Sequence, residues 1–104
     1  MVDTTRTAPT LSLLRERRAE ILRLAAQHGA HNVRVFGSVA RGDARPESDI
    51  DLLVEWDYTR ISDWGGAGLY EALEALLGHP VDIASVSQLR PRIRARVLAE
   101  CVPL

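Results

Sequence analysis

Residues 37–54 read Gly37-Ser38-Val39-Ala40-Arg41-Gly42-Asp43-Ala44-Arg45-Pro46-Glu47-Ser48-Asp49-Ile50-Asp51-Leu52-Leu53-Val54. Within this stretch, Asp49 and Asp51 stand two residues apart at the start of an apolar run. On an extended strand both side chains point to the same face, where two carboxylates repel each other unless a cation neutralises them. Mg²⁺ favours carboxylate and phosphate oxygens as ligands. The pair therefore indicates a Mg²⁺ site, with a solvated strand face as the alternative.

The segment before this pair indicates a phosphate site. Residues 33–36 alternate in the manner of a strand, and Gly37-Ser38 follows at its end. Because Gly37 has no side chain, the backbone N–H groups there can approach an anion. Arg41 and Arg45 lie in the same connection and are further candidates for a phosphate contact. An ordinary turn at Gly37 and surface ion pairs of the two arginines are the alternatives.

The composition is that of one small globular domain. The chain has 104 residues, 46 % of them hydrophobic and 26 % charged, enough for a single modest core. With 13 basic and 14 acidic residues, the net charge of −1 gives no sign of direct nucleic-acid binding. Lysine is absent, so phosphate charge must be met by arginine, backbone or metal. Cys101 is the single cysteine, which excludes an internal disulfide.

No targeting signal or long apolar span appears in the sequence, so we expect a cytoplasmic protein without a membrane partner. The three histidines, His28, His31 and His79, do not have the spacing of metal ligands.

Hydrophobic periodicity predicts the order of the elements. We expect a flexible N-terminal tail at residues 1–10 and then a single domain at 11–104. Its predicted elements are one amphipathic helix at about 11–28, strands at 33–37 and 49–56, a helix ending at Gly78, a strand from Val81 to Ala84, and an arginine-rich helix from Leu89 to Glu100. The relative direction of the first two strands is left open. This α-β-β-α-β-α order predicts the α/β (α+β) class.

The motif Gly-Ser, ten residues, Asp-x-Asp resembles that of the minimal nucleotidyltransferases of the DNA polymerase β superfamily. The resemblance covers residues 11–104, and the segment 76–83 resembles the strand that carries the third carboxylate of that superfamily, here Asp82. It implies a polymerase β-like nucleotidyltransferase fold, with a small mixed sheet packed with helices. Val39 is a departure, because many relatives carry a polar or aromatic residue at this position.

The resemblance also implies a chemistry, the transfer of a nucleoside monophosphate from a nucleoside triphosphate to a hydroxyl. Asp49, Asp51 and Asp82 would be the catalytic residues and the ligands of one or two Mg²⁺ ions. The residues expected to bind the nucleotide are Gly37, Ser38 and Arg41. For Asp82, a strand-end aspartate that only faces solvent is the alternative.

The acceptor is suggested by the resemblance alone. Larger superfamily members have an added helical domain, for which this chain has no room, so a second protein is expected to complete the site. The chain is similar to the MntA-type antitoxins of HEPN/MNT toxin–antitoxin pairs, which implies transfer of AMP from ATP to a tyrosine of a HEPN RNase toxin. The alternatives are an antitoxin that only binds the toxin, and an enzyme with a small-molecule acceptor whose pocket is completed by a homo-oligomer.

Two further groups of residues invite a functional interpretation. Trp56, Tyr58 and Trp64 follow the strand of the two aspartates and could stack on a base, meet a partner or pack in the core. Four arginines alternate along the last predicted helix, at positions 90, 92, 94 and 96. On a helix these positions spread around the axis, so we interpret them as a solvated face rather than an RNA-binding stripe.

Overall fold

The computed structural model describes residues 7–59 and 67–104. Within these ranges the helices are α1 (Leu11–Glu16), α2 (Arg18–Gln27), α3 (Gly37–Arg41), α4 (Ala67–Leu77) and α5 (Pro91–Glu100), with a 3₁₀ turn η1 at Val86–Gln88. The strands are β1 (Ala30–Phe36), β2 (Ile50–Trp56), β3 (Val81–Ser85) and β4 (Val102–Pro103). The predicted elements therefore occur in the predicted order, with the first helix divided in two and with α3, η1 and β4 as additions.

The strands form one mixed sheet in the order β3-β2-β1-β4. β1 runs antiparallel to β2 and to β4, whereas β2 and β3 are parallel. This confirms the mixed sheet and settles the direction of the first two strands, which spacing had left open. β4 is only two residues long and pairs with Arg34 and Val35 of β1.

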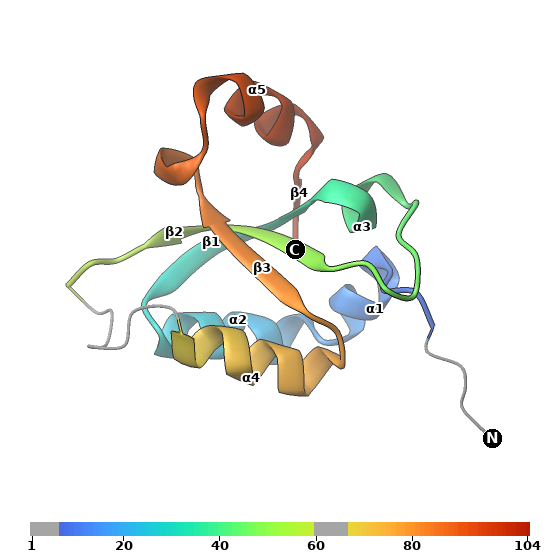
Figure 1. Cartoon of the computed structure of the whole chain (residues 1–104). Helices are drawn as coiled ribbons and strands as arrows, with labels where there is room; N and C mark the ends of the chain where they lie inside the picture. The colour runs from blue at the N-terminus through green and yellow to red at the C-terminus, as the bar shows by residue number, and fades with distance from the viewer. Residues whose placement is uncertain (1–6, 60–66) are drawn as a thin grey trace.

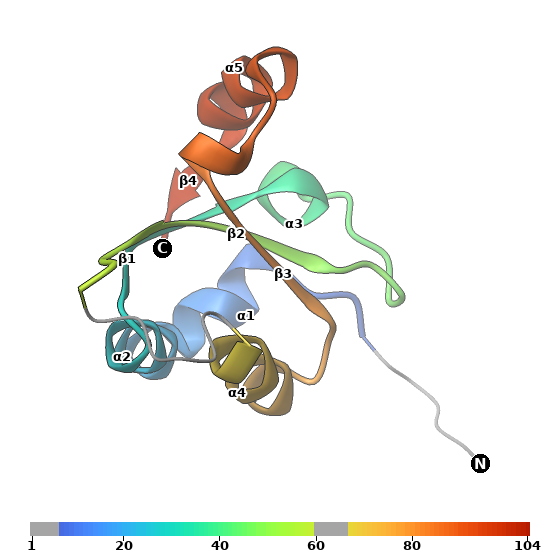
Figure 2. The ribbon, with the colours of Figure 1, turned by 60° about the vertical axis from the view of Figure 1, so that its left-hand side comes forward.

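Helices lie on both faces of the sheet. α1, α2 and α4 cover one face, and α3 and α5 lie on the other (Figures 1 and 2). The main core fills the space under the first face. Its strand residues include Val35, Ile50, Leu52, Val54 and Ile83, all of them buried.

The apolar face of β2 fixes where its carboxylate points. Ile50, Leu52 and Val54 alternate into the core, so Asp51 points to the opposite face. Burying one such aliphatic side chain contributes about 1.5–3 kcal/mol. A register slip by one residue would expose all three and bury the carboxylate, so the core holds Asp51 in place.

The predicted single helix at 11–28 is wrong in one respect, because it breaks at Arg17. Arg17 has φ −104° and ψ 15°, and it ends α1 before α2 begins at the next residue. No glycine or proline causes the break. Directly after it, the Arg18 Nε donates to the carbonyl of Leu104 at 3.0 Å. This tertiary contact connects the start of α2 to the last residue of the sequence, and helical periodicity cannot predict it.

Smaller boundary differences have local causes. β1 begins at Ala30, three residues before the predicted start, because Gly29 ends the preceding turn with a φ of +79°. α5 begins at Pro91 rather than Leu89, since proline favours the first helical position.

The predicted N-terminal tail falls partly outside the described residues, at positions 1–6. Pro9 is fully buried, and the Thr10 hydroxyl accepts a hydrogen bond from the N–H of Leu13 at 3.1 Å. Thr10 is thus the N-cap of α1.

α4 protects β3, the edge strand that carries Asp82. The Tyr70 hydroxyl donates to the Ile83 carbonyl at 3.0 Å and accepts from the Ile83 N–H at 3.2 Å. The Glu74 carboxylate accepts from the Val81 N–H at 2.9 Å. Side chains of α4 therefore make the hydrogen bonds to Val81 and Ile83, on either side of Asp82, that a further strand would otherwise make at this edge of the sheet.

None of the helices in the described part of the chain has the length and apolar character needed to span a bilayer.

Candidate active site

The turn between β1 and α3 brings the chain against Asp51. Phe36 ends β1 opposite Asp51 in the antiparallel ladder, and Gly37 follows with a φ of +73°. A Cβ atom at position 37 would collide with the Asp51 carboxylate. Glycine is therefore required twice here, for the left-handed backbone and for the close approach. The predicted neighbourhood of Gly37 and the Asp-x-Asp pair is present in the structure.

The three predicted carboxylates lie near the start of two parallel strands. Asp51 on β2 and Asp82 on β3 are register partners, so their backbones lie about 4.8 Å apart. Asp49 precedes β2 and is exposed, as is Asp82, whereas Asp51 is partly buried. Burial, and then repulsion by Asp82 and by Asp49, raises the pKa of Asp51 to about 6. The carboxylates thus share one electrostatic environment.

This donor set fits a hard divalent cation. A cation between Asp51 and its two neighbours would relieve the repulsion that raises the Asp51 pKa. Over residues 7–59 and 67–104, no three or more His, Cys, Asp or Glu side chains form a ready-made metal cluster. Mg²⁺ does not need one, because it is commonly held by one or two carboxylates together with substrate phosphates and water.

Val39 and Ser38 occupy different environments in α3. Val39 is buried in the core, which accounts for an aliphatic residue at this position. Ser38 is partly buried in the first turn, and its carbonyl accepts hydrogen bonds from the N–H groups of Gly42 and Asp43.

Arg41 lies beside the carboxylates but is engaged by other groups. Its Nη1 is 2.9 Å from the Glu100 Oε1, and its Nε is 3.3 Å from the Asp43 Oδ2. The guanidinium also lowers the pKa of Asp51, against the larger effects of burial and of the other carboxylates. Arg41 is thus placed as predicted near the site, and it forms an ion pair as the alternative expected. Arg45 has a different contact: its backbone N–H donates a hydrogen bond to the Ser48 hydroxyl, which closes the loop.

Glu100 is a site residue that the sequence analysis missed. The Gly37 N–H donates to its Oε2 at 2.8 Å, across 63 positions of sequence. Burial alone would raise the pKa of Glu100, but the hydrogen bonds from Gly37 and Arg41 outweigh it and hold that pKa below its ordinary value.

The register of β4 explains why Glu100 reaches Gly37. Val102 pairs with Val35 in an antiparallel ladder, so the residue two positions earlier arrives beside Gly37. The sequence carries no signal for this contact, because Glu100 belongs to no motif and β4 is too short to show a period.

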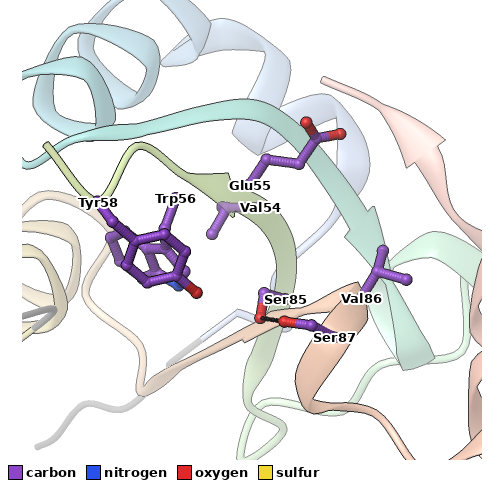
Figure 3. Close-up of a pocket in the computed structure, with 7 residues that line it drawn as sticks. All are labelled: Val54, Glu55, Trp56, Tyr58, Ser85, Val86 and Ser87. Carbon is purple, nitrogen blue, oxygen red and sulfur yellow. Dashed lines mark hydrogen bonds between the residues drawn. The ribbon is translucent and has the colours of Figure 1, made fainter.

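The aromatic residues Trp56 and Tyr58 lie away from the carboxylates. They line a pocket of about 280 Å³ together with Val54, Glu55 and residues 85–87. Figure 3 shows the two aromatic side chains together on one side and the Ser85 and Ser87 hydroxyls, 3.2 Å apart, on the other. Trp56 is five residues beyond Asp51 on β2, roughly 17 Å along the strand. Trp64, the third member of this predicted group, lies outside the described residues.

Comparisons with known proteins agree with the site geometry. The family model of the "Nucleotidyltransferase domain" matches residues 17–104. The chain belongs to this nucleotidyltransferase family. The resemblance seen in the sequence is thereby confirmed, and the protein is a minimal nucleotidyltransferase.

Two curated relatives support the assignment of this chain to the nucleotidyltransferases. The protein adenylyltransferase MntA of Thermococcus cleftensis is 40 % identical over 79 residues, which is 76 % of this chain and 79 % of the relative. A protein of Methanocaldococcus jannaschii that is provisionally named a protein adenylyltransferase is 32 % identical over 96 residues, 86 % of this chain and 95 % of the relative.

Solved structures share the fold of the nucleotidyltransferase. One, provisionally described as a minimal nucleotidyltransferase, has a TM-score of 0.79 and 53 % identity, and the match covers 92 % of this chain and 97 % of that chain. A crystal structure of a toxin–antitoxin with AMP-PNP has a TM-score of 0.66 at 20 % identity over 82 % of this chain and 69 % of that chain. At 20 % identity, the likeness to the toxin–antitoxin structure shows a shared fold alone.

Proposed function

We propose that this nucleotidyltransferase is a Mg²⁺-dependent protein adenylyltransferase that transfers AMP from ATP to a tyrosine hydroxyl of a cognate HEPN-domain RNase toxin, and so acts as its antitoxin. The observation that carries the proposal is the pairing of Asp51 with Asp82 where Gly37 approaches Asp51, with Asp49 near enough to raise the pKa of Asp51. The relative from Thermococcus cleftensis, named a protein adenylyltransferase, supports AMP as the group transferred. Because the donor is ATP, we assign the reaction to the cytoplasm.

The proposed reaction is an in-line displacement at the α-phosphorus of ATP. The acceptor oxygen forms a bond to phosphorus, the bond to the bridging oxygen breaks, and pyrophosphate leaves with the electron pair. Asp82 receives the proton of the acceptor hydroxyl. When bound, Mg²⁺ neutralises phosphate charge and favours the departure of pyrophosphate.

Each remaining residue has a positional role in this proposal. Asp49 and Asp51 provide the oxygen ligands for the metal, and Gly37 and Ser38 orient the β- and γ-phosphates through backbone and hydroxyl donors. Arg41 contributes the positive charge.

The exposure of Asp82 favours a protein acceptor. Asp82 lies on the edge strand β3 and faces solvent, so an acceptor carried by a second protein can approach it. The 280 Å³ pocket around Trp56 lies at the other end of β2 and does not enclose this carboxylate. The shared fold with a toxin–antitoxin crystal structure that contains AMP-PNP is consistent with such a partner.

The test uses the product of the adjacent gene, if that gene encodes a helical protein with an Arg-x₄₋₆-His motif. The purified partner is incubated with this chain, ATP and Mg²⁺, and its intact mass is measured. The expected result is a mass gain of one AMP on a tyrosine, absent with the Asp49→Asn/Asp51→Asn double variant. No gain on a partner that binds tightly would contradict the proposed catalysis.

One observation favours a second candidate, an antitoxin that neutralises the toxin by binding alone. Glu100 takes up the Gly37 N–H and the Arg41 guanidinium, both of which the catalytic proposal assigns to the nucleotide. Under this second candidate, the Asp49→Asn/Asp51→Asn variant would still neutralise the toxin in cells. Under the catalytic proposal, it would not.

A further inference from the structure

The side chain of Glu100 fills the space between two groups that can bind phosphate. Its Oε2 accepts the Gly37 N–H at 2.8 Å, and its Oε1 lies 2.9 Å from the Arg41 Nη1. The side chain is 16 % exposed, so it lies inside the site rather than on its rim. A carboxylate and a phosphate oxygen seek the same kind of donor, a backbone N–H or a guanidinium.

The charge around Glu100 makes simultaneous occupation costly. Asp49, Asp51 and Asp82 already raise the negative charge of the site, and Glu100 itself contributes to the raised pKa of Asp51. A triphosphate bound to Gly37 would place further negative charge beside the Glu100 carboxylate. Two anions at this distance repel strongly in a partly buried site.

The way in which Glu100 is attached allows it to leave. It is the last residue of α5, and the only residue of that helix that is fully buried is Val97. Ile93 and Leu98 on the same helix are 42 % and 43 % exposed. A change of side-chain rotamer at the helix end can therefore release both oxygens without opening the main core, which lies on the other face of the sheet.

We propose that Glu100 is an internal competitor of the nucleotide: it occupies the Gly37 N–H and Arg41 in the nucleotide-free protein, and the triphosphate of ATP displaces it. The inference rests on the proposed function, because it takes Gly37 and Arg41 as phosphate-binding groups. It goes beyond that function in assigning Glu100 the control of nucleotide affinity. It also gives the Arg41–Glu100 ion pair a role in the cycle of the enzyme.

The competition lowers the apparent affinity for ATP. That affinity is the intrinsic affinity multiplied by the fraction of molecules in which the Gly37 N–H and the Arg41 guanidinium are free. Glu100→Gln retains the size of the side chain but removes its charge, so its hydrogen bonds to Gly37 and Arg41 weaken. We expect the affinity for ATP with Mg²⁺ to rise about tenfold. The melting temperature without ATP should fall, because the free protein loses its charged contact. Glu100→Ala should likewise raise the affinity for ATP and lower the melting temperature.

The experiment is a calorimetric titration of ATP with Mg²⁺ into the full chain and its Glu100→Gln variant, with thermal unfolding of each in the absence of nucleotide. Glu20→Gln is the matched control, since Glu20 also pairs with an arginine, Arg17, at 3.1 Å but on the helix layer away from the site. The control should bind ATP as the wild type does.

Tighter binding by Glu100→Gln together with a lower melting temperature supports the inference. Equal or weaker binding by a folded Glu100→Gln overturns it, and weaker binding would show instead that Glu100 positions Arg41 for the nucleotide. If neither the wild type nor the variant binds ATP, the proposed function fails and the inference fails with it. The two failures are thus distinguishable.

Discussion

Asp51 is the register partner of Asp82 in the parallel β2–β3 ladder, so their side chains lie side by side on one face of the sheet, where Gly37 approaches Asp51. Burial and the neighbouring carboxylates raise the pKa of Asp51 to about 6. The fold keeps these repelling carboxylates together because the alternating apolar residues of β2 are buried in the core and fix the position of Asp51. Such a local sacrifice of stability is typical of functional sites.

Neutralising Asp51 should stabilise the free protein. Its pKa in the folded state, about 6, is above the ordinary value of 3.8. The folded protein therefore binds the Asp51 proton more tightly than the unfolded chain does, and stability from this group is lost as pH rises from about 4 to about 6. At pH 8, Asp51→Asn should raise the free energy of unfolding by about 2 kcal/mol, allowing for partial exposure.

Urea unfolding of wild type and Asp51→Asn at pH 8 and pH 4 measures this effect. The stabilisation should be present at pH 8 and much smaller at pH 4, where Asp51 is protonated in the folded protein and about half protonated in the unfolded chain. Glu20→Gln, an exposed charge change, should show neither effect. A destabilised Asp51→Asn at pH 8 would mean that the carboxylates are not in conflict.

Gly37→Ala should be far more harmful than alanine at a comparable glycine. Gly78 has the same φ of +73° but open space around it, whereas a Cβ at position 37 meets the Asp51 carboxylate. Gly78→Ala should cost about 1 kcal/mol for the backbone alone. Gly37→Ala should cost about 1–3 kcal/mol more, because the collision adds to the strain. Chemical denaturation of both variants measures the difference, and equal losses would contradict the close approach.

Removing the exposed carboxylates should abolish transfer but spare the fold. Asp49 and Asp82 are both exposed, so Asp49→Asn and Asp82→Asn should change the free energy of unfolding by less than about 0.5 kcal/mol. The rate of AMP transfer should fall on the order of 10²-fold or more in each. Circular dichroism and a transfer assay on the same preparations measure the two effects. Full activity of either variant at ordinary Mg²⁺ would overturn its assignment.

Tyr70→Phe should loosen the edge strand that carries Asp82. Without the hydroxyl, the Ile83 N–H and carbonyl lose their partner on the outer edge of β3. The expected cost is about 1–3 kcal/mol, with faster amide exchange at Ile83. Tyr58→Phe is the control, because Tyr58 is 74 % exposed and its hydroxyl should not affect stability. Unchanged exchange at Ile83 in Tyr70→Phe would show that α4 does not secure the strand.

The sequence predicted the site only as far as its signals are local. The alternation of Ile50, Leu52 and Val54 with Asp51 lies within one strand, and so does the position of Gly37 at the end of another. These features therefore predicted the carboxylate pair and the turn. The helix-covered sheet was predicted from the order of the elements together with the resemblance. Asp82 was assigned by resemblance, because nothing in its own strand marks it as a partner of Asp51.

Other features depend on contacts between distant parts of the chain. Glu100 reaches Gly37 because two residues of β4 pair with β1, and such a short strand has no detectable period. The break at Arg17 accompanies a contact of Arg18 with the last residue of the chain. Neither contact could be read from residues near it in sequence.

The most direct test of the central claim uses ATP labelled at either the α- or the γ-phosphate, with Mg²⁺, this chain and the product of the adjacent gene. The account predicts that the α-label becomes covalently attached to the partner, that the γ-label does not, and that Asp49→Asn/Asp51→Asn abolishes the labelling. Attachment of the γ-label, or no attachment of either label to a partner that binds this chain, would contradict it.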